Sequence, residues 1–547
     1  MSRIYKVLII TFCLLVCGGS ANAIDIHFSA SGGGGSYVSI WDHYDVDDSC
    51  EVSGKSSASF DDGVSMLDTR SISGPGDIDV FQRYSGSDDY IAWNGIYIQD
   101  GSETLINSNA YLTPAALAVD QDVSSFDAEV GEITFGGESG GLKNANQGLV
   151  SLFGSMDSRQ VMKVDDHVYV FQDSNIDAEY GSVYSFVSDS DGTRAISHAS
   201  VGQGTLSSIL VSEAGNSARA FQNTNIEDAE HGYVESYATD SDGKYAGSQA
   251  SVDHGTLSSI LVSEAGNSVK TFQNTNIEDA EYGSVNSYAR DVDGNSVQVS
   301  ATIINGKRLS TTQVVESDDG LRSQQNTVIE DAEEGHSGSW AREAETDNYV
   351  GIGVRVYDGS LSATNLKSEN HDGILSTSGE TSLDTDDWGY TWADTWIGEW
   401  EDPDCKIVQL YSQVSKGSID TRNLKSELDL GENVLKASGE VDLVTVDEGF
   451  ASDSAWYGHD SSVGVRCHVS DGTFSADLQS EEDADIKVLT AFGEGYITPL
   501  GLGGYGYAVA GTHDLWVDEN VNYGETLHAA MNSEISESGE SARVDVL

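Results

Sequence analysis

The chain has 547 residues and carries 27 Lys and Arg against 90 Asp and Glu, a formal net charge of −63. Such a charge repels nucleic-acid phosphate and anionic lipid, so we expect no nucleic-acid partner; cationic partners, divalent cations or high salt suit it better. Only 4 prolines stand beside 59 glycines, which excludes a proline-rich linker and a collagen.

The first 23 residues have the features of an export signal. Arg3 and Lys6 form a short basic region, the apolar run Val7–Val16 follows, and a small-x-small cleavage site ends at Ala23. We therefore expect residues 1–23 to be a signal peptide, a mature chain that begins at Ile24, and an extracellular or cell-surface location. No later stretch has the run of about 18 apolar residues that a membrane-spanning helix needs, so we expect no membrane span.

Internal repetition dominates the mature chain. The segment TLSSILVSEAGNS occurs at Thr205–Ser217 and again at Thr256–Ser268, and the decapeptide FQNTNIEDAE follows it at Phe221–Glu230 and Phe272–Glu281. Looser copies precede and follow these segments, for example the one that starts at Phe171. A fixed period of this kind indicates a repeat architecture with units of about 51 residues.

The repeat divides the mature chain into three parts. Residues 24–130 are expected to form a divergent N-terminal β region, 131–500 a β-repeat region and 501–547 a C-terminal β cap.

Each repeat unit reads as four strands without helices. Four runs of about seven to eleven residues alternate with the glycine-bearing segments AGN, DAEHG, DSDG and DHG, and such segments favour hairpin turns because glycine and asparagine accept positive φ angles. The pattern predicts an elongated all-β repeat protein, built as a two-layer antiparallel meander of β-arches. A β-solenoid and a β-propeller remain alternatives.

The strand faces mix polar and apolar residues. In the decapeptide, Phe221, Asn223 and Asn225 share one face, and Gln222, Thr224 and Ile226 share the other. Hydrophobicity alone sets the register of such strands weakly. One interpretation is that copies lie side by side, so that identical amides and phenylalanines form ladders; the other is recent duplication without a ladder.

Three Asp-x-Asp-Gly segments resemble calcium-binding loops, since calcium prefers carboxylate oxygens. They lack the third ligand and the glutamate of a full EF-hand loop, and plain hairpin turns are the alternative. The candidate ligands are Asp189, Asp191, Asp240, Asp242, Asp291 and Asp293. The acidic residues of the decapeptide, Glu227, Asp228 and Glu230, recur in later copies and present the same choice between calcium and a solvated loop.

Cysteine usage and catalytic motifs add little. The mature chain keeps Cys50, Cys405 and Cys467, which suits one disulfide and one free or intermolecular thiol. The GESGG motif around Ser139 matches a hydrolase nucleophile pattern, but no helix is expected after it, so we expect no enzyme activity.

The export signal, units of the QNTNIEDAE type, strands rich in Gly, Ser and Ala, strong acidity and scarce proline together resemble the secreted sheath proteins of methanogenic archaea. The resemblance covers the repeat region most clearly. It implies a structural protein whose copies assemble into amyloid-like β-rings that stack into a tube around the cells, and it transfers no catalytic residues.

Two functions are therefore expected as alternatives. The first is a structural protein that polymerises with copies of itself through β-strand pairing, as a sheath or surface layer. The second is a calcium-stabilised secreted adhesin or carbohydrate-binding protein, because the segment WGYTWADTWIGEW (Trp388–Trp400) has aromatic side chains that stack on sugars. An aromatic contact between the two sheet layers is the alternative interpretation of that segment.

Overall fold

The computed structural model contains only β-strands and turns in the part of the chain that it describes. It describes the backbone of residues 7–11, 22–32, 37–45, 50–60, 65–85, 91–113, 116–139, 143–164, 168–189, 191–214, 218–266, 269–317, 322–344, 348–371, 374–397, 406–429, 434–457, 461–483, 488–497, 502–510, 513–521 and 527–535, and most side chains between 123 and 442. Across these ranges no helix could cross a membrane.

The chain forms two compact units, Met1–Asn267 (unit 1) and Ser268–Leu547 (unit 2). Unit 1 holds β1 (Val7–Thr11), β2 (Asn22–Gly32), β3 (Tyr37–Asp45), β4 (Cys50–Phe60), β5 (Ser65–Ser85), β6 (Ile91–Thr113), β7 (Ala116–Ser139), β8 (Lys143–Val164), β9 (Val168–Ser188), β10 (Arg194–Ala214), β11 (Arg219–Thr239) and β12 (Tyr245–Glu264).

Unit 2 continues the same pattern and ends in shorter strands. It holds β13 (Val269–Arg290), β14 (Ser296–Ser317), β15 (Arg322–Arg342), β16 (Tyr349–His371), β17 (Ile374–Ile397), β18 (Lys406–Asp429), β19 (Val434–Tyr457), β20 (Ser461–Asp483), β21 (Val488–Ile497), β22 (Leu502–Ala510), β23 (His513–Val521) and β24 (Leu527–Ile535).

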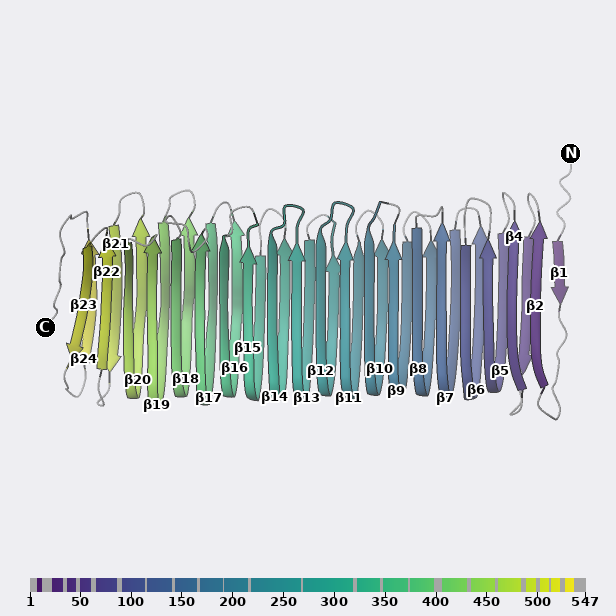
Figure 1. The fold of residues 1–547 in the computed structure, drawn as a ribbon, viewed down its shortest axis with the longest axis horizontal. Helices are drawn as coiled ribbons and strands as arrows, with labels where there is room; N and C mark the ends of the chain where they lie inside the picture. Colours follow the sequence, from purple (N-terminus) through teal and green to yellow (C-terminus); the bar gives the residue numbers. More distant parts are fainter. Residues whose placement is uncertain are drawn as a thin grey trace. The chain divides into compact units, whose positions relative to one another are not determined.

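Within each unit the long strands lie beside their neighbours in chain order (Figure 1). Strands β5 to β12 of unit 1 pair antiparallel with their chain neighbours, and so do β13 to β20 of unit 2. The predicted all-β antiparallel meander is therefore confirmed. Strands of this length begin at Ser65, upstream of residue 131, where we expected the repeat region to begin.

The first strands of unit 1 differ from this pattern because they pair in parallel. Strand β1 pairs with β3, β3 with the first half of β5, β2 with β4, and β4 with the second half of β5. Parallel pairing of short strands is the pattern that the β-solenoid alternative required, and it is confined to β1–β5 among the described strands.

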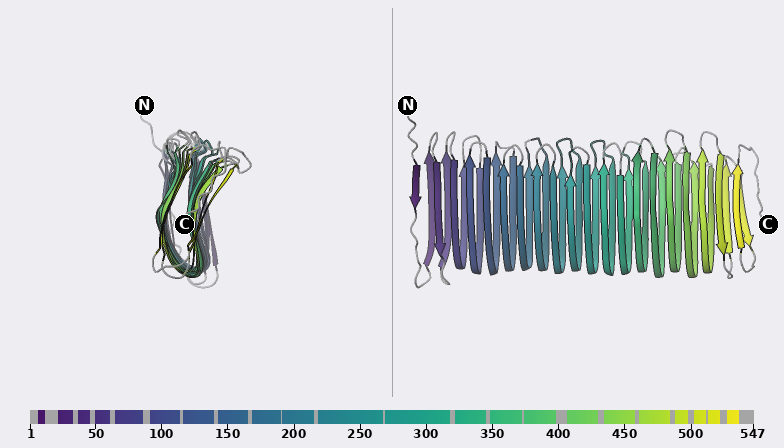
Figure 2. Two further views of the ribbon diagram at one scale, coloured as in Figure 1. Left: turned by 90° about the vertical axis from the view of Figure 1, so that its left-hand side faces the viewer. Right: turned by 180° about the vertical axis from the view of Figure 1, so that it is seen from behind.

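Each long strand bends near its middle and contributes to two layers, as the end-on view shows within each unit (Figure 2). The bends coincide with non-glycine residues whose φ angles are positive, from 46° to 54°. In unit 1 these are Phe153, Gln203, Asp228 and His254; in unit 2 they include Asp279, Asn305, Asp331, Asp358 and Lys416. The spacing of Asp228, Asp279 and Asp331 reproduces the repeat period.

This bend corrects the prediction that all four glycine-bearing segments of a unit are hairpin turns. The segments DAEHG (Asp228–Gly232) and DHG (Asp253–Gly255) lie inside β11 and β12 and carry the chain from one layer to the other. One sequence repeat of about 51 residues therefore forms two arched strands, and each arched strand has two straight halves. We call the layer that contains Leu206 and Ile226 layer A, and the layer whose halves adjoin the Asp-Gly turns layer B.

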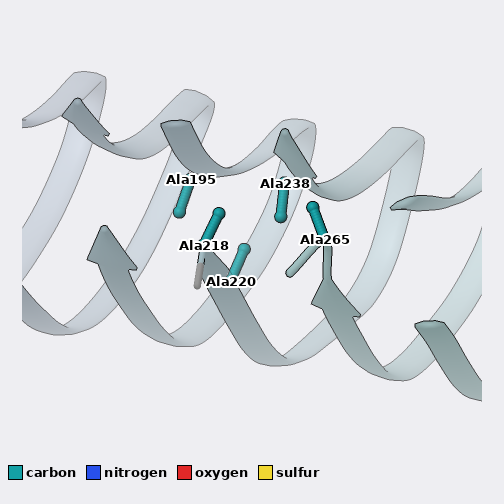
Figure 3. Close-up of a cluster of buried hydrophobic side chains, with 5 residues drawn as sticks. All are labelled: Ala195, Ala218, Ala220, Ala238 and Ala265. Carbon is teal, nitrogen blue, oxygen red and sulfur yellow. The ribbon is translucent and has the colours of Figure 1, made fainter. Parts of the chain in front are cut away.

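The space between the layers is narrow and lined by small and aliphatic side chains. Burial alternates along each half, and the buried face of the decapeptide carries Gln222, Thr224 and Ile226. Near the turns of unit 1 the interior is a cluster of alanines from neighbouring strands (Figure 3): Ala195, Ala218, Ala220, Ala238 and Ala265. Among the described side chains, the buried hydrophobic residues include no aromatic residue.

Serine hydroxyl groups form hydrogen bonds between the two layers across this interior. Ser185 and Ser212 lie 2.8 Å apart between their oxygen atoms, and Ser263 donates to the carbonyl of Ser236 at 2.8 Å. Because these polar groups are buried, each would be costly without a partner. These hydrogen bonds between the layers therefore explain why serine occurs in both straight halves of the arched strands.

Within unit 1, the decapeptide at Phe221–Glu230 in β11 does not lie beside its looser copy that starts at Phe171 in β9, because β10 pairs with both strands. The register places Leu210 of β10 and Leu261 of β12 on either side of Gln222. The prediction of an amide ladder between adjacent copies is therefore wrong for these strands, because an antiparallel meander alternates the two repeated segments. The alternation explains why both segments are repeated as a pair.

Candidate functional site

The candidate calcium residues lie in the turns that join the layer B halves. In all three segments the backbone carbonyl of the first aspartate accepts a hydrogen bond from the glycine N–H, at 3.1–3.3 Å. Gly192, Gly243 and Gly294 have φ angles of 90–94°. This is a hairpin turn in which glycine takes the left-handed position.

The carboxylates of these turns also bond to the turn itself. Asp240 Oδ1 accepts from the N–H of Asp242 at 3.0 Å and of Lys244 at 2.9 Å, and Asp291 Oδ1 accepts from the N–H of Asn295 at 2.9 Å. In the first turn, Asp191 Oδ1 accepts from the N–H of Thr193. These contacts support the hairpin interpretation.

No group of three or more His, Cys, Asp or Glu residues with metal-binding geometry occurs among the described side chains. Calcium binding by the six aspartates remains a prediction.

The acidic residues of the decapeptide lie at the opposite edge, at the bends. Asp228 and Asp279 hold the left-handed backbone position, which aspartate accepts more readily than most residues. The next residue, Ala229 or Ala280, is buried and lies opposite a glycine of the neighbouring strand. The recurring Asp-Ala pair therefore has a structural role. The aspartate adopts the left-handed backbone conformation of the bend, and the small alanine side chain fits its narrow interior.

A depression of about 540 Å³ lies on the bend edge of unit 1. Its lining includes Phe153, Asp177, Glu179, Gln203 and Asp228. Phe153 is 57% exposed, so an apolar ring stands beside carboxylates at this edge.

The aromatic segment forms a surface on the outside of layer B in unit 2. Trp388, Tyr390, Trp392 and Trp396 are partly exposed, whereas the alternate residues of β17 are buried. One of these, Thr395, bonds to Ser426 in the interior at 2.6 Å. The interpretation as a contact between the layers is therefore wrong for the described part of the segment; Trp400 lies outside the described residues.

Neighbouring strands extend this surface, which we call the aromatic face. The register aligns Tyr349 with Trp396, Tyr357 with Trp388, and Trp392 with Tyr411. Among the described side chains, the aromatic face consists of Trp340, Tyr349, Tyr357, Trp388, Tyr390, Trp392, Trp396 and Tyr411.

Ring contacts hold the aromatic face in one arrangement. The ring centroids of Trp388 and Tyr390 lie 4.8 Å apart, those of Tyr390 and Trp392 5.5 Å, and those of Tyr357 and Trp388 5.3 Å. These separations are typical of favourable aromatic pairs. The Trp392 ring stacks on His336 at 5.7 Å, with an interplanar angle of 21°.

Glycines of β16 make room for two of the rings. A Cβ atom on Gly353 would come within 2.2 Å of the six-membered ring of Trp392, and one on Gly351 within 2.3 Å of the Tyr349 hydroxyl. The Trp392 ring therefore lies directly on the backbone of β16. Sequence reasoning identified the tryptophans but missed these glycines, for which the signal was the alternation Tyr-x-Gly-x-Gly at 349–353.

The charged groups of the aromatic face balance one another. Arg355 pairs with Glu334 and lies 4.9 Å from the centre of the Tyr357 ring. Burial raises the pKa of Asp394 to about 7, against the opposing effect of a hydrogen bond with Trp396. Burial, together with the nearby Arg355 charge, lowers the pKa of His336 to about 4, so His336 is neutral at pH 7.

The remaining sequence candidates are dispersed. Ser139 ends β7 and is followed by strand β8, so the hydrolase motif has no helix after it. Cys50 begins β4 in unit 1, Cys467 lies in β20 of unit 2, and Cys405 falls outside the described residues.

No protein-family model matches this chain, and no curated protein matches it either.

Proposed function

We propose that this protein is an extracellular structural protein that polymerises with copies of itself by pairing strands at the ends of its sheet, as a sheath or surface layer. The observation that carries the proposal is the open meander. Among the described strands, β1 pairs only with β3 and β2 only with β4, while β23 pairs only with β22 and β24 only with β21. Each of these strands has one edge free to pair with another chain.

The sequence offers little protection of those edges. Proteins guard edge strands with proline, with charged side chains, above all lysine, or with very short strands, and the sequences of β2, β23 and β24 contain neither proline nor lysine. Strand β23 does carry Asp514, Asp518 and Glu519, so pairing at its edge requires cations or salt to screen these charges. Cleavage after Ala23 would also remove β1, which would leave β3 with β5 as its only described partner. The resemblance to archaeal sheath proteins supports the same function.

Proline substitution at the edges tests this mechanism. The variant Ser29→Pro/Ala530→Pro removes one N–H from β2 and one from β24, and we expect it to slow polymerisation of purified residues 24–547 at least tenfold in light scattering. The matched control Ser29→Ala/Ala530→Ser keeps both N–H groups and should polymerise at the normal rate. Equal rates for all three proteins would contradict assembly through these edges.

A further inference from the structure

We infer that the aromatic face of unit 2 binds an uncharged polysaccharide, a chain of β-linked pyranose rings whose flat apolar faces stack on the tryptophans. This goes beyond self-assembly, because it gives the protein a second, non-protein partner. The inference rests on the geometry, the locality and the charge of the face.

The geometry fits stacking on sugar rings. The Trp392 ring lies against the backbone at Gly353 through its Cζ2 and Cη2 atoms, stacks on His336 and remains partly exposed. Trp388, Tyr390 and Trp392 occupy alternate positions of one strand, and Trp396 stands four residues beyond Trp392. By strand rise, Trp388 to Trp396 spans roughly 26 Å, enough for several consecutive sugar rings.

The supporting contacts make this surface rigid. Ring pairs on three strands and the underlying glycines fix the side chains before any ligand arrives, so little conformational entropy is lost on binding. Hydrogen-bonding groups lie among the rings: the Gln413 side chain accepts from the Tyr411 hydroxyl at 3.0 Å. Tryptophan and tyrosine combine an apolar ring with a polar atom, which suits a ligand with apolar faces and hydroxylated edges.

The locality of the face argues against a surface for stacking copies of the protein. If copies of the protein stacked through this side of layer B, we would expect the aromatic side chains to recur in each sequence repeat. On the same side, however, β13 and β14 carry no tryptophan, and the tyrosines Tyr282 and Tyr288 stand among polar residues such as Ser284, Asn286 and Ser300. Within the described side chains of unit 2, the dense ring cluster is confined to β15–β18.

The charge argues against a charged ligand. Among the described side chains, the charged residues of the face are Arg342, Arg355, Glu334 and Asp394. Arg355 is paired with Glu334, and Asp394, whose pKa burial raises to about 7, is only partly ionised at neutral pH. The whole chain has a net charge of −63, which repels polyanions. An uncharged chain meets neither obstacle.

Binding of residues 24–547 to insoluble cellulose, a glucose polymer, and chitin, an N-acetylglucosamine polymer, tests the inference, with immobilised heparin as the anionic comparison. We expect retention on cellulose or chitin, and weaker retention on heparin. The variant Trp388→Ala/Trp392→Ala should weaken polysaccharide binding at least tenfold. Trp388→Phe/Trp392→Phe keeps a ring at each position and should stay within about threefold of the original protein.

The control variant is Tyr237→Ala/Tyr245→Ala, which removes a stacked pair from layer B of unit 1, outside the aromatic face. It should bind polysaccharide normally. The inference is overturned by absence of binding to both polymers, by stronger binding to heparin, or by equal binding of the alanine variant at Trp388 and Trp392. It is also overturned if that variant loses self-association while no polysaccharide binds, since the face would then join copies of the protein.

Discussion

At the scale of single residues, the arches depend on glycines that face alanines across neighbouring strands. A Cβ atom on Gly204 would lie 2.6 Å from the Glu227 carbonyl oxygen and 3.1 Å from the Cα atom of Ala229. Backbone atoms cannot move aside as a flexible side chain can. The inside of the bend therefore accepts no side chain at this position.

We predict that Gly204→Ala destabilises the arch of β10 and β11 by about 2 kcal/mol, the range typical of overpacking. Faster hydrogen exchange in peptides covering the two bends measures the effect. Gly202→Ala is the matched control, because its Cβ would meet its nearest atoms at 3.8 Å or more. If both variants exchange alike, the tight lining of the bend is not what limits this position.

Asp394 gives the aromatic face a pH dependence. Burial raises the pKa of Asp394 to about 7 in the folded protein, against about 3.9 in an unfolded chain. The folded state therefore holds this proton more tightly. The contribution of Asp394 to the free energy of unfolding is greatest below about pH 4, falls as the pH rises to about 7, and then levels off. The effect is at most about 4 kcal/mol, since each pKa unit corresponds to about 1.4 kcal/mol.

Asp394→Asn removes the ionisation and should abolish this loss of stability. We expect hydrogen exchange in β16–β18 of the variant to be slower than in the original protein at pH 8, and similar near pH 4 after correction for the intrinsic exchange rate. Parallel pH profiles for the two proteins would show that the ionised carboxylate carries no penalty.

At the scale of elements, substitutions at the bend of β11 can show whether Asp228 is needed for its backbone conformation or for its charge. Asp228 has a φ angle of 53°. We predict that Asp228→Asn is nearly neutral, because asparagine also accepts this conformation, while Asp228→Val costs about 1–2 kcal/mol. Thermal unfolding measures both; a destabilising Asp228→Asn would show that the charge matters more than the backbone.

Substitutions in the Asp-Gly turns can likewise distinguish calcium binding from a purely structural role of these aspartates in the hairpin. If calcium binds there, it should raise the unfolding temperature, and Asp240→Asn/Asp242→Asn should reduce that increase, since the turns at Asp189/Asp191 and Asp291/Asp293 remain. The hairpin contacts alone predict no calcium response, since an asparagine Oδ1 can still accept the N–H groups of Asp242 and Lys244.

The sequence predicted the repeat period and the strand halves, but not which glycine-bearing segments reverse the chain. DAEHG and DSDG both supply a residue for positive φ, and only the partner strands decide whether the result is an arch or a hairpin. The even-numbered positions Trp388 to Trp396 were predictable as one face. Whether that face points inward was not, because both faces of β17 mix polar and apolar residues.

At the scale of the whole molecule, the proposed polymerisation depends on the outer edges of β1, β2, β23 and β24, each of which pairs with a single strand among those described. Addition of one copy to the next at such edges is a head-to-tail contact, and a head-to-tail contact that does not close into a ring extends without limit. A sheet made of arched strands would then continue from molecule to molecule with the same strand spacing. The proposed polymerisation would therefore use the same kind of strand pairing that already joins strands within each unit.

The most direct test is fibre diffraction and electron microscopy of purified residues 24–547, concentrated with and without calcium and reductant. We predict ordered sheets, filaments or hoops with a reflection near 4.7–4.8 Å along the direction of strand stacking. A monodisperse monomer that persists at high concentration under all these conditions, without that reflection, would contradict the structural role and leave the polysaccharide surface as the main candidate for function.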